Sequence, residues 1–148
     1  ALPAAALQRI GAQVTASELG HIGEIRVVIE AGLPLSYLWH DLAARDRAIT
    51  LFGKLRVWDT EANNGVLIYL LLADRAIEIV ADRGLNQHVD AAQWQALIGP
   101  MRAAFAQGRY EAGLGDAVAT IDTLLRRHYA LAPGQANPNE LPDQPLMR

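Results

Sequence analysis

The chain has 148 residues, of which 51% are hydrophobic and 20% charged, and a chain of this length suits one domain with a sizeable core. It contains no cysteine, which excludes disulfides, thiolate metal sites and a cysteine nucleophile. The net charge is −3, so nucleic-acid binding, which favours basic surfaces, is not expected. The longest apolar run covers residues 66–73 and is far shorter than the ~20 residues that span a bilayer.

The first residue is Ala1 rather than Met, and no signal peptide is visible. We therefore expect a cytoplasmic location, or a periplasmic one if a signal or anchor has been removed from the N-terminus.

A helix is predicted for residues 3–19, because Leu7, Ile10 and Val14 recur at helical spacing. A strand follows at residues 22–30, where β-branched side chains dominate. The apolar spacing of residues 36–55 then predicts one long helix. Its polar side chains are expected to face solvent. They are Asp41, Arg45, Asp46 and Arg47.

A polar loop at residues 57–65 leads to the continuous apolar run of residues 66–72. Such a run is typical of a strand that is buried on both faces, and therefore central in its sheet. Residues 75–81 form the next predicted strand. The connection of two residues between these strands requires antiparallel pairing.

Two helices are predicted in the last third of the domain. Asp90 caps the first, and Pro100 is expected to kink or break it before Gly108. The second covers residues 109–129. Residues 131–148 hold four of the seven prolines, so we expect an extended or disordered tail after a domain that covers residues 1–130. Removal of residues 133–148 should then cost little stability.

This element order predicts that three polar segments meet at one edge of the sheet. The first β-α-β unit should be a parallel, right-handed crossover, and the third strand should run antiparallel. The starts of the first two strands and the end of the third then lie together. The segments at these points are residues 23–24, 59–65 and 82–84.

The side chains of this edge carry mainly oxygen atoms, the ligands that Ca²⁺ prefers. We therefore predict a site for Ca²⁺ or a small ligand here, with Arg83 available either to neutralise an anion or to pair internally. Ordinary turn chemistry is the alternative explanation of the same residues. The candidate metal ligands are Asp59, Asp82 and Glu24, and the candidate ligand-binding residues are Glu24, Thr60, Asn63, Asn64, Arg83 and Gly84.

Motifs of other chemistries are missing from the sequence. There is no Gly-x-Ser-x-Gly elbow, no Walker loop and no His-Glu-x-x-His pair. A glycine-rich motif that binds dinucleotides directly follows a strand. No strand is predicted before Gly113-Leu-Gly115, so no nucleotide cofactor is expected. His21 precedes Gly23 and Glu24, where it serves either as a loop residue or as a ligand or proton donor at the polar edge.

Three stretches of the chain resemble the TPM domain family. Residues 23–30 (Gly-Glu-Ile-Arg-Val-Val-Ile-Glu) are similar to its opening strand, and residues 63–69 with 73–84 to its signature hairpin. The spacing of Phe105, Gly108, Tyr110 and Gly113 is similar to its "F…G.Y..G" segment. The resemblance covers about residues 5–130 and is greatest to short bacterial members encoded beside LemA-type proteins.

The resemblance implies a Rossmann-like α/β fold, a three-layer α/β/α sandwich around a twisted mixed sheet of about four strands. It also implies Ca²⁺ binding, as in some members, and a role in binding or assembly at a membrane-associated protein complex. The alternative function is a weak, metal-assisted acid phosphatase, an activity of a plant member. No nucleophile of that activity maps onto this chain.

Overall fold

Four strands form one mixed sheet in the order β3-β2-β1-β4. As predicted, β1 and β2 are parallel and β2 and β3 antiparallel. The fourth strand comes from the C-terminal tail and pairs in parallel with β1 at Val28 and Ile29. The strands are β1 (Glu24–Glu30), β2 (Gly65–Leu71), β3 (Ala76–Ala81) and β4 (Leu146–Met147). The computed structural model describes residues 2–39, 43–60, 64–130, 142–143 and 145–147.

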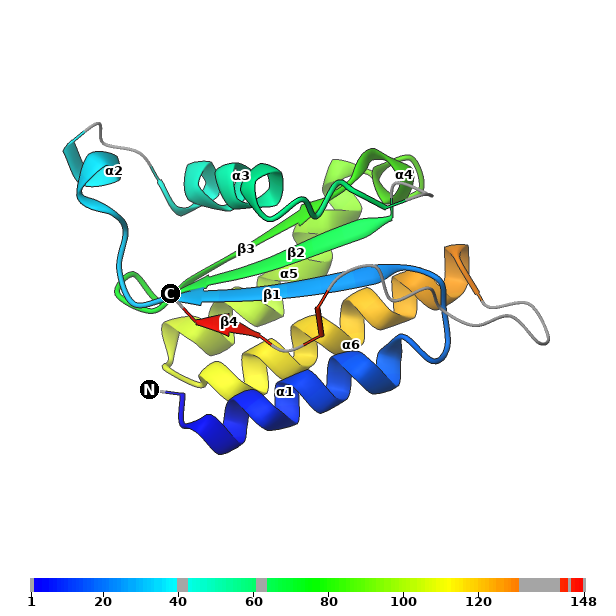
Figure 1. Ribbon diagram of the computed structural model, residues 1–148, viewed down its shortest axis with the longest axis horizontal. Coiled ribbons are helices and arrows are strands. Elements are labelled where there is room, and N and C mark those ends of the chain that lie inside the picture. Colours follow the sequence, from blue (N-terminus) through cyan, green and yellow to red (C-terminus); the bar gives the residue numbers. More distant parts are fainter. Residues whose placement is uncertain (1, 40–42, 61–63, 131–141, 144, 148) are drawn as a thin grey trace.

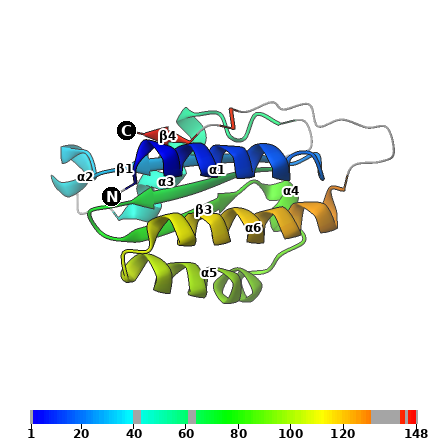
Figure 2. The ribbon, with the colours of Figure 1, turned by 90° about the horizontal axis from the view of Figure 1, so that it is seen from below.

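Helices cover both faces of this sheet, which makes the predicted three-layer α/β/α sandwich (Figure 1). One face carries α1 (Ala4–Ser17), α5 (Ala91–Ala106) and α6 (Tyr110–His128), with α6 between the other two (Figure 2). The opposite face carries α3 (Ala44–Lys54), with α2 (Leu35–Trp39) on the same side. The short α4 (Arg83–Asn86) follows β3 directly. Among the described helices, none has the length and apolarity needed to cross a bilayer.

Successive side chains of a strand point to opposite faces of the sheet, so the hydrophobic core has two parts. Ile68 and its neighbours on one face pack under α1, α5 and α6, whereas Leu67 and Tyr69 pack under α3. All seven residues of β2 are buried, which confirms a strand covered on both faces, although it begins and ends one residue earlier than the predicted range of 66–72.

Two predicted helices differ from the observed ones. Residues 36–55 form two helices rather than one, because Ala43 has an extended backbone (φ −91°, ψ 171°) at the start of α3. The Asp46 carboxylate accepts a hydrogen bond from the Ala43 N–H at 2.8 Å and so caps this new start. Near the other end of the chain, α5 continues through Pro100, so of the predicted kink or break, the break is wrong.

Arg47 is buried, although the amphipathic pattern placed it on a solvated face. Its Nε and Nη2 atoms both donate to the Glu30 carboxylate at 2.8 Å. The Tyr69 hydroxyl donates to the same carboxylate at 2.8 Å. The bidentate ion pair of Arg47 with Glu30 and the Tyr69 hydrogen bond connect α3 to β1 and β2. They also compensate the Glu30 and Arg47 charges, whose burial would otherwise cost free energy.

The turn between α5 and α6 explains the glycines of the family-like segment. Gly108 has φ +76°, a left-handed conformation that favours glycine at the end of a helix. A Cβ at Gly113 would lie 3.0–3.1 Å from the Phe105 ring. The missing side chain therefore lets α6 approach α5 closely.

Candidate functional site

Three of the predicted site residues, Glu24, Asn64 and Asp82, meet at one edge of the sheet. The Glu24 N–H donates to the Asn64 carbonyl at 3.4 Å, and the Asp82 N–H donates to the Gly65 carbonyl at 2.9 Å. The Asn64 side-chain amide donates to the Ile22 carbonyl at 3.3 Å. Parallel pairing of β1 with β2 and antiparallel pairing of β3 thus bring together residues that are up to 58 positions apart, as the topology predicted.

Thr60, Arg83 and Gly84 have local roles around this edge. The buried Thr60 hydroxyl accepts a hydrogen bond from the Asn64 N–H at 3.1 Å and so fixes the entry into β2. Asp82 caps α4, because its Oδ1 accepts from the Arg83 N–H at 2.8 Å. The Arg83 side chain is exposed, and Gly84 lies within α4.

Asp59 is engaged in a local surface ion pair. Its carboxylate lies 2.8 Å from Arg56 Nη2, and about half of its side chain is exposed. Exposed pairs of this kind contribute little stability. Asn63 and Glu61, also predicted at this edge, lie outside the described residues.

A cluster of three carboxyl groups adjoins the edge and includes two residues that the sequence did not single out. Glu18, at the end of α1, hydrogen-bonds through its side chain to both Glu24 and Asp143. Glu18 and Glu24 are buried. Asp143 comes from the tail and also accepts a hydrogen bond from the Thr15 hydroxyl at 2.9 Å. We refer to Glu18, Glu24 and Asp143 as the carboxyl cluster.

Burial is the main reason why the pKa of Glu18 lies well above its usual value, and the hydrogen bonds to Glu24 and Asp143 raise it further. Carboxylates this close cannot all be charged unless a cation lies among them, so a proton is retained in its absence. The negative charge of the carboxyl cluster must therefore be neutralised, either by protons or by a bound cation.

Two further oxygen atoms at the edge are buried without a hydrogen-bond partner among the described residues. They are Asn64 Oδ1 and Asp82 Oδ2. A buried acceptor without a partner costs about 1–3 kcal/mol, so a bound ion, water or ligand atom at these positions would be stabilising.

The donor set matches a hard cation in chemistry but is not a finished metal centre. Carboxylate and amide oxygens are the ligands that Ca²⁺ takes. Within the described parts of the chain, however, no group of three or more histidine, cysteine, aspartate or glutamate side chains is arranged to hold a metal ion. A cation would therefore have to displace the proton between Glu18 and Glu24.

The TPM domain family matches residues 1–124. The chain belongs to the TPM domain family.

Solved structures agree with this assignment. This TPM domain is similar to the BA42 protein from the psychrophilic bacterium Bizionia argentinensis, with 26% identity, a TM-score of 0.84, and coverage of 99% of this chain and 95% of that chain. It also shares its fold with the N-terminal domain of a P. gingivalis protein, at 21% identity and a TM-score of 0.69 over 88% of this chain and 82% of that chain. No curated protein sequence matches the chain.

His21 of this TPM domain belongs to a buried hydrogen-bond chain. The Gly23 N–H donates to His21 Nδ1 at 3.1 Å, so the other ring nitrogen, Nε2, carries the proton. His21 Nε2 then donates to Ser17 Oγ at 2.8 Å, and Ser17 Oγ donates to Asp122 Oδ1 at 2.6 Å. Arg126 Nε lies 2.9 Å from both oxygens of Asp122.

The direction of this chain argues against serine catalysis. A nucleophilic serine gives its proton to a histidine, but Ser17 gives its proton to Asp122 and receives one from His21. Burial lowers the pKa of His21 to about 4, against the opposing effect of Asp122. His21 is therefore neutral at pH 7, and we interpret it as a structural residue that joins α1, β1 and α6.

Glu18 and Asp143 are the residues of the edge that sequence reasoning missed. Glu18 directly follows the last residue of α1 and is not marked by any motif. Asp143 lies in a proline-rich segment that is 119 positions from Glu24, and its approach depends on the pairing of β4 with β1. The one signal in the sequence that points to further carboxyl groups here is the number of carboxylates that the predicted topology already places at this edge.

Proposed function

We propose that this TPM domain is a binding and assembly module whose sheet edge takes up Ca²⁺. The single observation that carries the proposal is the carboxyl cluster of Glu18, Glu24 and Asp143 at the start of β1. Glu18 hydrogen-bonds to both of the other carboxyl groups, and such a cluster is stable only when protons or a cation neutralise it. Oxygen atoms of Asn64 and Asp82 at the same edge extend the donor set.

Glu24 and Glu18 are the proposed primary ligands, because they are the buried members of the cluster. Asp143 would close the site from the tail, and Asn64 Oδ1 would add a neutral oxygen. Asp82 remains a candidate through its Oδ2 atom. Asp59 is a weaker candidate than the sequence suggested, because its carboxylate is paired with Arg56. A bound cation would neutralise the carboxylates of the cluster in place of the proton that they retain without it.

Such a site would connect the tail to the body of the domain. Asp143 already accepts from Thr15 on α1, and β4 pairs with β1. Ca²⁺ would strengthen this attachment, because one ligand comes from the tail and two from the body. The exposed surface beside the site would then have a fixed shape when Ca²⁺ is present.

A partner that is part of a membrane-associated complex remains our proposal for what this surface binds. Leu19 directly follows Glu18 and is 77% exposed. An exposed leucine next to a charged site is suited to a protein contact in which apolar and ionic groups act together. The role of Ca²⁺ in this proposal is structural.

Thermal unfolding with and without millimolar CaCl₂ tests the proposal. We expect the wild type to gain several degrees in melting temperature, because a ligand that binds only the folded state stabilises it. Glu24→Gln should remove the gain. Asp59→Asn, a matched change of a carboxylate that is paired with Arg56, should keep it. An unchanged melting temperature of the wild type in CaCl₂ would rule out the site.

The alternative, a metal-assisted phosphatase, is favoured by one observation. Asp82 Oδ2 is buried without a described partner, and a cation held there could polarise a phosphoryl oxygen. Hydrolysis of p-nitrophenyl phosphate by purified wild type, lost in Asp82→Asn, would favour this function. Equal activity in both proteins would mean that Asp82 has no catalytic role or that the activity belongs to a contaminant.

A further inference from the structure

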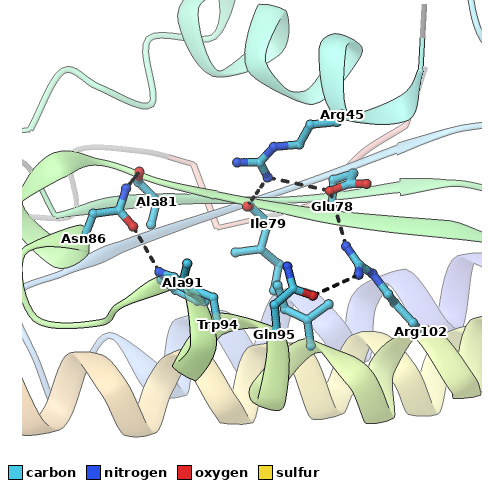
Figure 3. A pocket seen from close by; sticks show the side chains of 10 residues that line it. Arg45, Glu78, Ile79, Ala81, Asn86, Ala91, Trp94, Gln95 and Arg102 are labelled. Carbon is cyan, nitrogen blue, oxygen red and sulfur yellow. Dashed lines mark hydrogen bonds and ion pairs between the residues drawn. The ribbon is translucent and has the colours of Figure 1, made fainter.

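A second polar site lies at the opposite side of the sheet, along the outer edge of β3. A cavity of about 400 Å³ is formed there between α3 and α5, which pack on opposite faces of β3 (Figure 3). Its volume falls in the range of small-molecule sites. None of the residues of the carboxyl cluster lines it, so it is independent of the proposed Ca²⁺ site.

Two arginines enter this cavity from the two helices and face one carboxylate between them (Figure 3). Arg45 Nη1 of α3 lies 3.6 Å from Glu78 Oε2, and Arg102 Nη2 of α5 lies 3.9 Å from the same atom. Both distances exceed the ~2.7–2.9 Å of a charge-assisted hydrogen bond. The arrangement therefore has a positive charge in excess and guanidinium donors that Glu78 does not satisfy.

Each arginine is held by one further hydrogen bond, which is short for Arg45 and long for Arg102. Arg45 Nη1 donates to the Ile79 carbonyl at 2.6 Å, and Arg102 Nη1 to Gln95 Oε1 at 3.5 Å. About half of each arginine side chain is exposed, against 18% for Glu78. Arginine presents five donors in a planar fork that matches a carboxylate, so most donors of this pair are available to a ligand.

An apolar wall stands beside the charged groups. Trp94 and Ile98 of α5 and Ile79 of β3 line the cavity. The Trp94 indole donates to Asn86 Oδ1 at 3.0 Å, and Asn86 donates in turn to the Ala81 carbonyl at 2.8 Å. These bonds hold the indole ring at the site, where its face is suited to a flat hydrocarbon group.

The same contacts argue against a peptide that would add to β3 as a further strand. Arg45 and Asn86 already bind the outward carbonyls of Ile79 and Ala81, so a peptide would have to displace both side chains. Side chains that occupy the ladder positions protect an edge strand from such pairing. A compact ligand leaves both contacts in place.

We propose that this cavity binds a small organic carboxylate with an aromatic or branched apolar body. The ligand carboxylate bridges Arg45 and Arg102 in the position that Glu78 approaches, and its body packs on Trp94 and Ile98. Glu78 competes with the ligand for the two guanidinium groups, which keeps the affinity modest in the wild type.

Benzoate is the probe, and a two-dimensional ¹H–¹⁵N NMR titration of the full chain is the measurement. We expect the Trp94 indole signal and the amides of Glu78, Ile79 and Gln95 to shift with saturation in the millimolar range. Benzamide has the same shape without the charge and should cause no saturable shifts at these concentrations. Sulfate lacks the apolar body and should bind several-fold more weakly than benzoate.

Variants separate the roles of the charged residues. Arg45→Gln and Arg102→Gln should each weaken benzoate binding about tenfold, and Arg127→Gln, an exposed arginine outside the cavity, should not change it. Glu78→Gln should instead tighten binding several-fold, a gain that damage to the fold would not produce. Absence of saturable shifts, equal binding of benzamide, or no gain in Glu78→Gln would overturn the proposal.

Discussion

Glu18 and Glu24 form a hydrogen bond between two carboxyl groups, and the two residues are only 4% and 0% exposed. Such a pair keeps a proton at neutral pH, because two adjacent buried charges repel. The unfolded chain does not keep it, since an exposed glutamate is ionised above about pH 4.5. Folding at pH 7 without a cation therefore requires proton uptake. The stability contributed by Glu18 falls as the pH rises above about 4.5, where the unfolded chain has lost this proton.

Glu18→Gln removes this requirement, because the glutamine amide can donate to Glu24 without a titrating proton. We expect the variant to be more stable than the wild type at pH 7 by about 1–2 kcal/mol in the absence of Ca²⁺. It should also gain less stability from CaCl₂. Urea denaturation measures both effects. The exposed Glu111, which pairs with Arg9 at 2.6 Å, provides the control, because Glu111→Gln should change stability by less than about 1 kcal/mol. A less stable Glu18→Gln variant would contradict this account.

His21 should make stability depend on pH in the opposite direction. Its pKa is lowered to about 4 by burial, with Asp122 raising it and Arg126 lowering it, whereas an unfolded histidine titrates near 6.5. Between these values the unfolded state binds the extra proton, so the stability that His21 contributes is lost as the pH falls from 6.5 to 4.

Comparison with His21→Asn isolates this effect from other titrating groups. The variant should be less stable at pH 7, and the difference from wild type should shrink by up to about 3 kcal/mol at pH 4. Urea denaturation across this range measures the difference. A gap that does not change with pH would show that His21 is not held in its neutral form.

The C-terminal tail should contribute to stability, contrary to the expectation from composition alone. Asp143 accepts from Thr15, Pro145 is buried, and β4 pairs with β1. We expect a chain that ends at residue 132 to lose about 1–3 kcal/mol, because it loses a strand pair and buried surface. Thermal unfolding of the truncated and full chains measures the loss. Equal melting temperatures would mean that the tail does not pack on the body.

Ile68 lies in the middle of β2 and is fully buried. Ile68→Ala should cost about 2–5 kcal/mol, through lost burial and the cavity that remains. Ile49→Ala is the matched control, because Ile49 is 53% exposed on α3 and its change should stay within about 0.5 kcal/mol. Chemical denaturation compares the two. Similar costs for both substitutions would contradict the central position of β2.

The sequence predicted those parts of the fold that local pattern encodes. The apolar run at residues 66–72 and the short connection after it predicted β2, β3 and their antiparallel pairing. Asp90 was correctly predicted to cap α5, where its carboxylate accepts from the Gln93 N–H at 2.8 Å. The non-helical backbone at Ala43 was missed, because the apolar spacing continues across both helices.

At the site, contacts between residues far apart in the sequence could be predicted only where strand direction determines them. Glu24, Asn64 and Asp82 could be placed at one edge because strand direction alone determines their positions. Asp143 could not, since β4 is a strand of two residues that has no periodicity to detect. The partly buried hydrogen bond of Ser17 with Asp122 spans 105 positions and likewise depends on how α1 packs against α6.

The most direct test of the proposed cation site is a Ca²⁺ titration followed by backbone chemical shifts. The account predicts saturable shifts at millimolar Ca²⁺ or below, concentrated at Glu18, Glu24, Asn64, Asp82 and Asp143, and their loss in Glu24→Gln. Shifts that are absent, or that spread over exposed carboxylates and persist in Glu24→Gln, would contradict it.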